Sequence, residues 1–305
     1  MGQSKQQSQQ QTPIRLVLSH SSLSKFHQCN RKFYWEYVWP DRTDLITQFW
    51  DGSGAMAAFG QTVHKIMEHL YTGHFVGIPD EESIEVIRAA KFEGVKVYKK
   101  DEPLVTVEQI GMAVQELYNT YFHDDTVAYT CLPEITKVAP LGLYTDYKSI
   151  LDLALHKPEP AQEIPTVAPT KIVDYKTSTY TPEDKQFMDH HGQMLGQLFA
   201  SGAEVCVIRH IHISKGKIDV TEHPIQRDDY LIELWANEAR TVANTIRRYA
   251  KDGFWPMNSP SACGAFGRKC PFFHMCEGGS RPWPGMTEVG RKPVKEQNNA
   301  GTTNT

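Results

Sequence analysis

The stretch KIVDYKTS, residues 171–178, places a carboxylate and an ammonium two residues apart after a run of bulky apolar residues. Because side chains alternate along a strand, we expect Asp174 and Lys176 on one face and Val173 and Tyr175 on the other. Such a pair forms either a surface salt bridge, which contributes about 0–1 kcal/mol, or half of a metal-dependent active site. The stretch therefore predicts a strand that ends at a charged site.

A second carboxylate lies inside another apolar run. In SILDLAL the residues Leu151, Leu153 and Leu155 are expected to share a core-facing side, and Asp152 is expected on the opposite side. An ionised carboxylate in such a strand needs a charged partner or a metal ion. Pairing with a basic residue alone is the simpler interpretation.

The two acids belong to one site if their strands are neighbours. The carboxylates of Asp152 and Asp174 can then meet at one edge of the sheet. Carboxylate oxygens together with water and a phosphate suit Mg²⁺ or Mn²⁺. Lys176 would position the attacking water or stabilise charge that develops on the phosphate.

A helix near the N-terminus adds a histidine. Apolar spacing in AAFGQTVHKIMEHLYTG, residues 57–73, predicts an amphipathic helix that ends at Gly73. Gly60, His64 and Glu68 form a stripe beside its apolar face, and the glycine leaves room for a cation or a backbone to approach. A histidine on a helix is usually solvated or hydrogen-bonded. His64 is a candidate metal ligand here because two strand acids accompany it.

The order of patterns along the chain indicates the fold class. Helical patterns come first, then β-branched runs bounded by Pro and Gly, a helix, a hairpin around a Lys-Gly turn, and a long helix over about 228–251. These patterns predict an α/β or α+β domain with a central sheet flanked by helices, N-terminal helices and a Cys-bearing C-terminal segment. We expect disordered tails at 1–13 and 286–305 around a single domain of residues 14–285.

Composition excludes several classes of protein. No apolar run reaches the roughly 18 residues that a membrane helix needs, and the polar N-terminus lacks the apolar core of a signal peptide. A net charge of −4 gives no global positive field for nucleic acid. We therefore expect a cytoplasmic protein whose cysteines are free or metal-bound, with Cys131 and Cys206 buried in strands.

The other cysteines have a spacing of their own. Cys263, Cys270 and Cys276 lie in one short segment, and Cys29 is the natural fourth ligand of a tetrathiolate site. Such a site holds Zn²⁺ or a [4Fe–4S] cluster, and unmetallated thiols are the remaining alternative. Either metal group would clip the C-terminal segment to the first helix.

Together these motifs resemble a known family. Gly60-x-x-x-His64 on an early helix, Asp152 on a strand and Asp-Tyr-Lys at 174–176 on the next are similar to the RecB-like branch of the PD-(D/E)XK nuclease superfamily. The resemblance covers about residues 18–280 and implies a restriction-endonuclease-like core. It implies that the histidine and both acids bind Mg²⁺ or Mn²⁺ and that the lysine is catalytic.

Further positions follow from the resemblance. In the family's Gln-x-x-x-Tyr motif, Gln193 takes the Gln place as a DNA contact, whereas Gln197 stands where the family has Tyr. Glu134 and Glu68 are expected as additional acids. A Pro-rich loop over 156–169 is expected as an insertion near the DNA.

The cysteine pattern carries its own resemblance. One distant N-terminal cysteine plus a C-terminal trio resembles the iron–sulfur clip of the AddB nuclease domain and of the CRISPR-associated RecB-like exonucleases. The resemblance implies a structural [4Fe–4S] cluster, with structural Zn²⁺ as the alternative. Basic residues near it, interleaved with aromatic ones, are expected to contact DNA, although solvated charge is the simpler interpretation of each. These residues are Arg31, Lys32, Arg268 and Lys269.

The sequence thus predicts a metal-dependent DNA nuclease, an exonuclease on linear or single-stranded ends, in recombination, repair or replication. Its expected partners are DNA and other recombination or replication proteins, and the lack of a fused helicase favours a phage or mobile-element origin. A non-catalytic DNA-binding subunit that keeps the fold and cluster is the alternative. An iron–sulfur electron carrier would not need the Asp-x-Lys pair.

Overall fold

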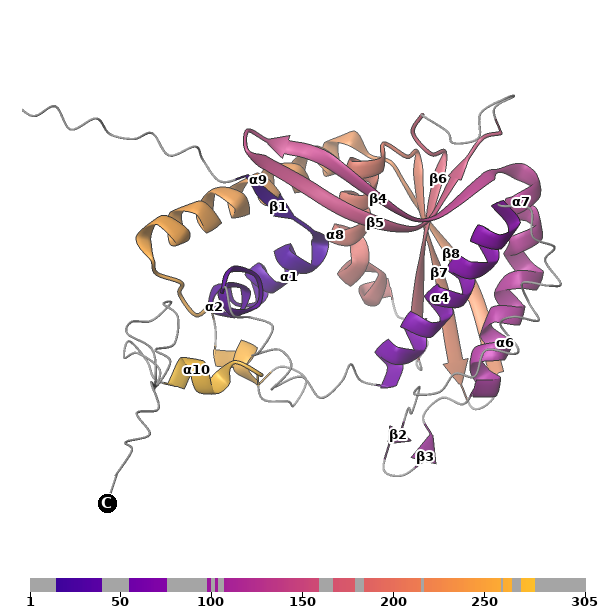
Figure 1. Ribbon diagram of the computed structural model, residues 1–305, viewed down its shortest axis with the longest axis horizontal. Coiled ribbons are helices and arrows are strands. Elements are labelled where there is room, and N and C mark those ends of the chain that lie inside the picture. The colour runs from indigo at the N-terminus through magenta and orange to yellow at the C-terminus, as the bar shows by residue number, and fades with distance from the viewer. Residues whose placement is uncertain are drawn as a thin grey trace, which may run out of the picture.

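The computed structural model shows a mixed sheet with helices on both faces (Figure 1). This architecture confirms the expected fold class. The described residues are 15–39, 55–75, 98–99, 102–103, 107–158, 167–178, 184–214, 217–258, 260–264 and 270–277. Both expected tails and most of the Pro-rich loop lie outside these residues.

In the described part of the chain the main sheet has six strands. The pairing runs β1–β5–β6–β7–β8, and β4 also pairs with β5, so β5 has three partner strands. The β6–β7 and β1–β5 pairs are parallel, and the β4–β5, β5–β6 and β7–β8 pairs are antiparallel. The strands are β1 (Leu16–Leu18), β4 (Thr130–Gly142), β5 (Thr145–His156), β6 (Lys171–Ser178), β7 (Val205–Ser214) and β8 (Lys217–Gln226).

Two hydrophobic clusters pack on opposite faces of this sheet. One joins it to α8 and α9, with the N-terminal helices α1 and α2 at its end. The other joins it to α4 and α6. The helical segments are α1 (His20–Gln28), α2 (Asn30–Phe33), η1 (Tyr34–Val38), α4 (Ala55–Phe75), α6 (Val107–Leu117), η2 (Tyr118–Phe122), α7 (His123–Ala128), α8 (Asp184–Ser201), α9 (Asp229–Asp252), η3 (Pro260–Cys263) and α10 (Phe273–Glu277).

Local sequence explains where several helices begin and end. Ser19 caps α1 by accepting a hydrogen bond from the Ser22 N–H. Asp228 caps α9, which ends at Gly253 with φ at 66°. The helix α4 continues to Phe75, so Gly73 does not end it.

A short antiparallel pair precedes α6. Strand β2 (Tyr98–Lys99) pairs with β3 (Glu102–Pro103), and α6 begins a few residues later.

Side-chain alternation changes along β5, which corrects one expectation. Leu151 packs with Tyr147 in the cluster under α8 and α9, whereas Leu153 and Leu155 pack in the cluster under α4. The three leucines therefore do not share a face. The cause lies in β4, where Glu134 has φ at 51°, a conformation that few non-glycine residues adopt. Its neighbours pair with residues on either side of Asp152, so the change of face occurs in both strands together.

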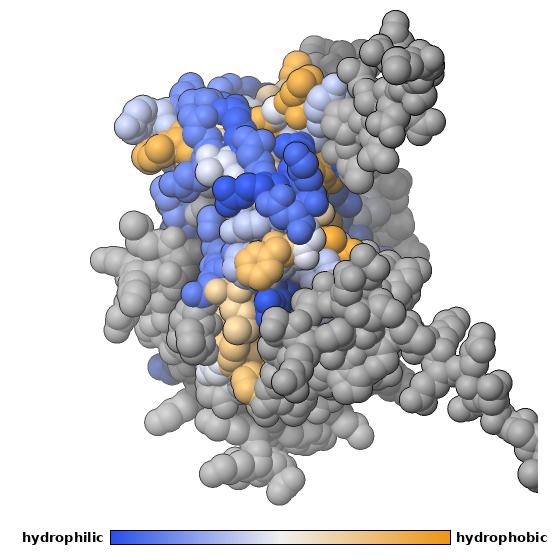
Figure 2. Space-filling view, turned by 90° about the vertical axis from the view of Figure 1, so that its left-hand side faces the viewer, coloured by the Kyte–Doolittle hydropathy of each residue, from blue (hydrophilic) through white to orange (hydrophobic). Residues whose placement is uncertain are grey.

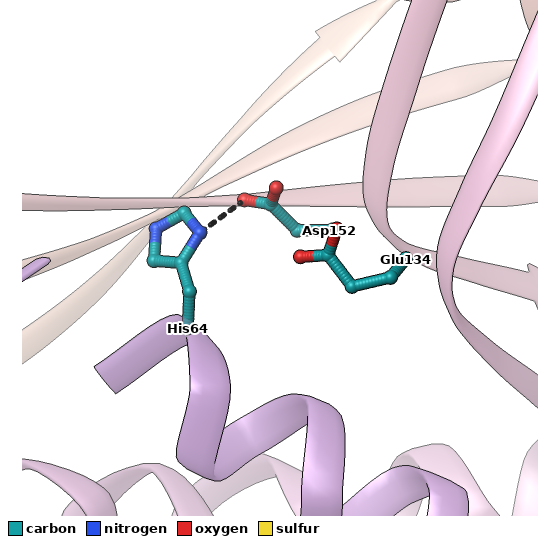
Figure 3. Close-up of side chains that lie close together, drawn as sticks. All are labelled: His64, Glu134 and Asp152. Carbon is teal, nitrogen blue, oxygen red and sulfur yellow. Dashed lines mark ion pairs between the residues drawn. The ribbon is translucent and has the colours of Figure 1, made fainter. Parts of the chain in front are cut away.

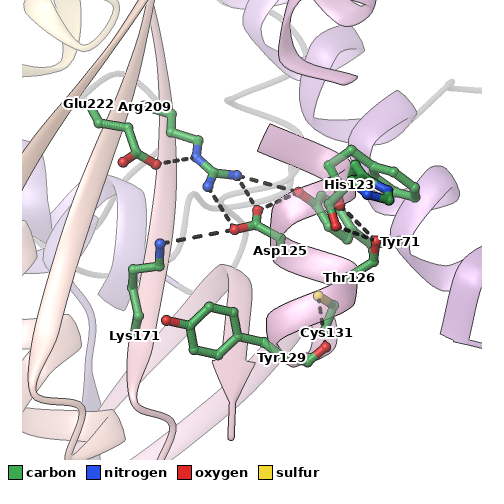
Figure 4. A network of polar contacts seen from close by, with 10 residues as sticks. Tyr71, His123, Asp125, Thr126, Tyr129, Cys131, Lys171, Arg209 and Glu222 are labelled. Carbon is green, nitrogen blue, oxygen red and sulfur yellow. Dashed lines mark hydrogen bonds and ion pairs between the residues drawn. The ribbon is translucent and has the colours of Figure 1, made fainter. Parts of the chain in front are cut away.

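A buried ion pair joins α7 to the sheet, and α4 hydrogen-bonds to it (Figure 4). Arg209 of β7 donates from its two terminal nitrogens to the two oxygens of Asp125 in α7, at 2.6 and 3.0 Å. The Tyr71 hydroxyl of α4 donates to the same carboxylate at 2.7 Å, and the Arg209 Nε donates to Glu222 at 2.8 Å. Both charges of the central pair are buried, so each depends on the other for its solvation.

The opposite side of the molecule is mainly polar at its surface. The helix α9 buries Trp235, Ala239 and Val242 against the core and exposes charged and amide side chains between them. Figure 2 shows this side, where hydrophilic residues predominate among those described. No described helix is long and apolar enough to cross a membrane.

One close approach in this core gives a stability prediction. A Cβ on Gly196 of α8 would lie 2.2 Å from the Tyr147 hydroxyl oxygen and 2.9 Å from a Trp235 ring atom, both of which belong to buried residues. Gly196→Ala should therefore lower the free energy of unfolding by about 1–3 kcal/mol, measured by urea titration. A Cβ on Gly192 of the same helix meets nothing within 4 Å, so Gly192→Ala should be neutral or stabilising. Equal effects of the two substitutions would contradict the packing.

Candidate active site

The site lies in a notch where β6 separates from β5. The edge of β5 that faces β6 pairs with β1 at Thr145–Tyr147 and with β6 at Leu153–Leu155. Between these stretches no described strand pairs with that edge. Asp152 occupies the end of this unpaired stretch and accepts a hydrogen bond from the Tyr175 backbone N–H at 2.9 Å.

His64 enters the notch from α4. Its Nε2 lies 2.9 Å from the Tyr175 carbonyl oxygen, and its Nδ1 lies 3.3 Å from Asp152 Oδ2. Because a carbonyl only accepts, Nε2 carries the hydrogen, and Nδ1 is the atom that faces the acid. Burial lowers the pKa of His64, but Asp152 outweighs burial and raises it.

The glycine one turn earlier explains how α4 comes so close. A Cβ on Gly60 would lie 3.0 Å from the Thr177 hydroxyl oxygen. The sequence indicated that this small residue allows a cation or a backbone to approach. The structure shows that the group closest to Gly60 is the Thr177 side chain of β6.

Glu134 completes a group of three ligand-type side chains. One nitrogen or oxygen from each of His64, Glu134 and Asp152 lies within 4.8 Å of the others (Figure 3). Burial raises the pKa of Glu134, and the charges of Asp152 and Glu68 raise it further. Its unusual backbone conformation occurs at this site, where strain is often found in functional proteins.

The donor set fits a divalent cation. Two carboxylates and an imidazole whose Nδ1 faces them offer the ligands that Mg²⁺ and Mn²⁺ use, Mn²⁺ accepting the nitrogen more readily. The negative charges of Asp152 and Glu68 act on Glu134, and a bound cation would reduce this repulsion.

Asp174 and Lys176 lie beside this group as an ion pair, with the Asp174 side chain buried and the Lys176 side chain 22% exposed. The Lys176 Nζ is 2.5 Å from Asp174 Oδ2. Burial raises the pKa of Asp174. Burial lowers the pKa of Lys176, but Asp174 and Asp152 outweigh burial and raise it, so the amine stays charged.

Two glutamines of α8 hold the other oxygen of Asp174. The Nε2 atoms of Gln193 and Gln197 donate to Asp174 Oδ1 at 2.8 and 3.0 Å. The structure thus brings His64, Asp152 and Glu134 together, and leaves Asp174 outside that group, turned toward Lys176 and the glutamines. The i, i+4 spacing of the glutamines was the signal for their shared target, because it places both side chains on one helix face.

Glu68, expected as an additional acid, lies outside the group of His64, Glu134 and Asp152. It pairs with Lys65 at 2.5 Å, and its charge acts on Glu134.

The four cysteines named for a metal group lie near one another, and the Cys270 N–H donates to the Cys263 carbonyl oxygen at 2.8 Å. Cys29 follows α1, and the segment with the other three packs against the same hydrophobic cluster, beside α2 (Figure 1). Burial raises the pKa of the Cys270 thiol, and the charges of Cys263 and Cys29 raise it further. Burial likewise raises the pKa of Cys276, with Cys270 and Cys29 adding to it. Among the described residues no three of their sulfur atoms form a group within 4.8 Å.

The basic residues near the cysteines have intramolecular contacts. The Arg31 Nε donates to the Trp255 carbonyl oxygen at 3.0 Å, and Lys32 Nζ donates to Gln28 at 2.9 Å. Burial lowers the pKa of Lys32. Their contact with DNA stays a prediction, and Arg268 and Lys269 lie outside the described residues.

Cys131 and Cys206 are buried, as expected. The Cys206 thiol lies 3.4 Å from the Gln197 amide oxygen, so it helps to orient the glutamine that holds Asp174.

Comparison with known proteins places this geometry in context. Residues 17–137 match the family model of the PD-(D/E)XK nuclease superfamily. This match supports a relation of the chain to that superfamily. The matched region contains His64 and Glu134, and Asp152, Asp174 and Lys176 lie beyond it. No curated protein matches the sequence.

Two solved structures, both described as exonucleases, are similar to the chain. A candidate exonuclease from Eubacterium rectale is 13% identical, with a TM-score of 0.48, 86% of this chain and 91% of that chain covered. The alkaline exonuclease LHK-Exo from Laribacter hongkongensis is 10% identical, with a TM-score of 0.30, 69% of this chain and 97% of that chain covered.

Proposed function

We propose that this chain is a metal-dependent DNA nuclease that hydrolyses phosphodiester bonds at DNA ends. The observation that carries the proposal is the notch: a histidine and two carboxylates with ligand atoms within 4.8 Å of one another, next to the ion pair of buried Asp174 with Lys176. The superfamily match over residues 17–137 supports it.

Each residue has a role that follows from its contacts. His64, Glu134 and Asp152 would hold Mg²⁺ or Mn²⁺, and Asp174 would be a further ligand. When bound, the cation supplies Lewis-acid activation of water and stabilisation of phosphate charge. Gln193 and Gln197 fix the carboxylate of Asp174 in one orientation.

Lys176 acts as a charged donor. Its raised pKa keeps it protonated at neutral pH, so it does not serve as the general base. Its ammonium instead donates hydrogen bonds to the attacking water or to a phosphoryl oxygen, where negative charge develops.

The experiment that tests this proposal is cleavage of end-labelled single-stranded and duplex DNA with Mn²⁺ or Mg²⁺. We expect the wild type to release nucleotides from an end, and Lys176→Ala to reduce the rate at least about 100-fold while binding of the DNA is kept. Lys157→Ala, an exposed lysine after β5, is the matched control and should cut normally.

Two results of this experiment would overturn parts of the proposal. Binding without cleavage by the wild type would reject catalysis and favour the non-catalytic DNA-binding subunit. Cleavage of circular DNA as fast as linear DNA would reject the exonuclease assignment.

We further propose that Cys29, Cys263, Cys270 and Cys276 hold a structural [4Fe–4S] cluster. The charges of Cys29 and Cys263 raise the pKa of Cys270, those of Cys29 and Cys270 raise the pKa of Cys276, and four thiolates are the donor set that such a cluster takes. The cluster would join the segment after α9 to α2, where the Arg31 N–H already donates to the Pro256 carbonyl oxygen at 3.1 Å. We place the protein in the cytoplasm, in recombination, repair or replication.

Metal analysis of anaerobically purified protein tests the cluster. We expect iron and acid-labile sulfide in equal amounts, and loss of both in Cys29→Ser together with a lower free energy of unfolding. Cys131→Ser, a buried thiol elsewhere, should keep the iron. Zinc in place of iron would contradict the cluster and favour the zinc alternative.

A further inference from the structure

A histidine-rich surface continues from Lys176 across the sheet. The register of β6, β7 and β8 places Lys176, His210 and Thr221 side by side in one row. The next row outward consists of Ser178, His212 and Asp219. Because residues paired in neighbouring strands point to the same side, both rows share the face of Asp174.

Histidines from other elements border the same face. His223 of β8 lies in the row of Asp174, opposite Ile208. Lys176 and His190 of α8 both act electrostatically on His20 at the start of α1, and His190 acts on His210, so these side chains lie near one another. We call His20, Ser178, His190, His210, His212 and His223 the histidine face.

Contacts within the face fix its inner part. The Ser178 hydroxyl lies 2.9 Å from His210 Nε2, and both residues are buried. The rings of His210 and His212 are nearly parallel, at 16°, with centroids 6.5 Å apart. His212 lies 3.9 Å from Asp219, and His223 lies 2.9 Å from the Thr221 hydroxyl. The half-buried rings of His20, His190, His212 and His223 form the accessible part.

The chemistry of this face differs from that of a phosphate-binding groove. Lys176 lies at one end of these rows, and Lys217, which pairs with Ser214 in the outermost row, lies at the other. Among the described residues of the rows, these lysines are the only side chains with a permanent positive charge. Between them lie imidazoles, hydroxyls and the Asp219 carboxylate. Burial lowers the pKa of His20 and of His210 to about 4, so these rings are neutral at pH 7.

Planar rings that carry hydrogen-bond donors and acceptors suit nucleobases. Binding along a phosphate backbone relies on Lys and Arg, whereas unpaired bases stack on rings and hydrogen-bond through their edges. A duplex keeps its bases stacked and paired, and cannot offer their faces to such a surface.

We propose that the histidine face binds the unpaired bases of the nucleotides next to the scissile phosphate, so that the substrate is a single strand. This inference rests on the proposed function and deepens it. The Lys176 ammonium marks the phosphate end of the path, and the strand crosses β7 and β8 toward Lys217.

Equilibrium binding tests the proposal without relying on cleavage. The fluorescence anisotropy of a labelled single-stranded oligonucleotide is compared with that of the same strand carrying consecutive abasic sites at its end, with Ca²⁺ present. We expect the wild type to bind the abasic strand about tenfold more weakly, because bases that stack on rings contribute to affinity. The double variant His212→Ala/His223→Ala should bind both strands alike, at the weaker level.

Controls separate this proposal from the proposed function. His69→Ala/His123→Ala removes two exposed histidines far from the face and should keep the preference for bases. His20→Ala, on a different element, provides a second test if the double variant does not fold. Equal binding of both strands by the wild type, or tighter binding of duplex, would overturn the inference even if the enzyme cuts DNA. Base-dependent binding without cleavage would sustain it while the nuclease proposal fails.

Discussion

The backbone of Tyr175 is the point on which the site depends. In a strand, the N–H and C=O of one residue point to the same side, and those of Tyr175 point to where β5 has separated from β6. Asp152 accepts from its N–H and His64 donates to its C=O, so two side chains take the bonds that a paired strand would have used. A buried peptide group must find such partners, which makes the two side chains part of the fold as well as of the site.

The scaffold under this peptide is itself polar and buried. The Tyr175 side chain packs in the cluster under α4, where the Asp125–Arg209 pair is solvated by Tyr71. Tyr71 lies seven residues after His64, two turns along α4, so the same helix is fastened at the site and at the ion pair. Loss of one partner of a buried pair costs about 3–5 kcal/mol, and here it would also release the helix that presents His64.

Some of this could be predicted from local sequence, and some could not. The alternation of residues 171–178, the hairpin of β7 and β8 and the bounds of α9 depend on short-range patterns, and the structure agrees with them. The change of face at Asp152 depends on the positive φ of Glu134, which no pattern of polar and apolar residues encodes. The role of Gln197 depends on how α8 lies over β6, a tertiary relation. The sequence therefore named the chemical groups of the site, and packing decided which of them touch.

The most direct test of this account is the position of a bound ion. In crystals soaked with Mn²⁺, we expect an anomalous difference peak in the notch between His64 Nδ1, Glu134 and Asp152, and the peak should disappear in His64→Ala/Glu134→Ala. An ion held there would show that the peptide of Tyr175 organises a metal site. An empty notch in a protein that cuts DNA, or an ion bound only by other residues, would contradict the central claim.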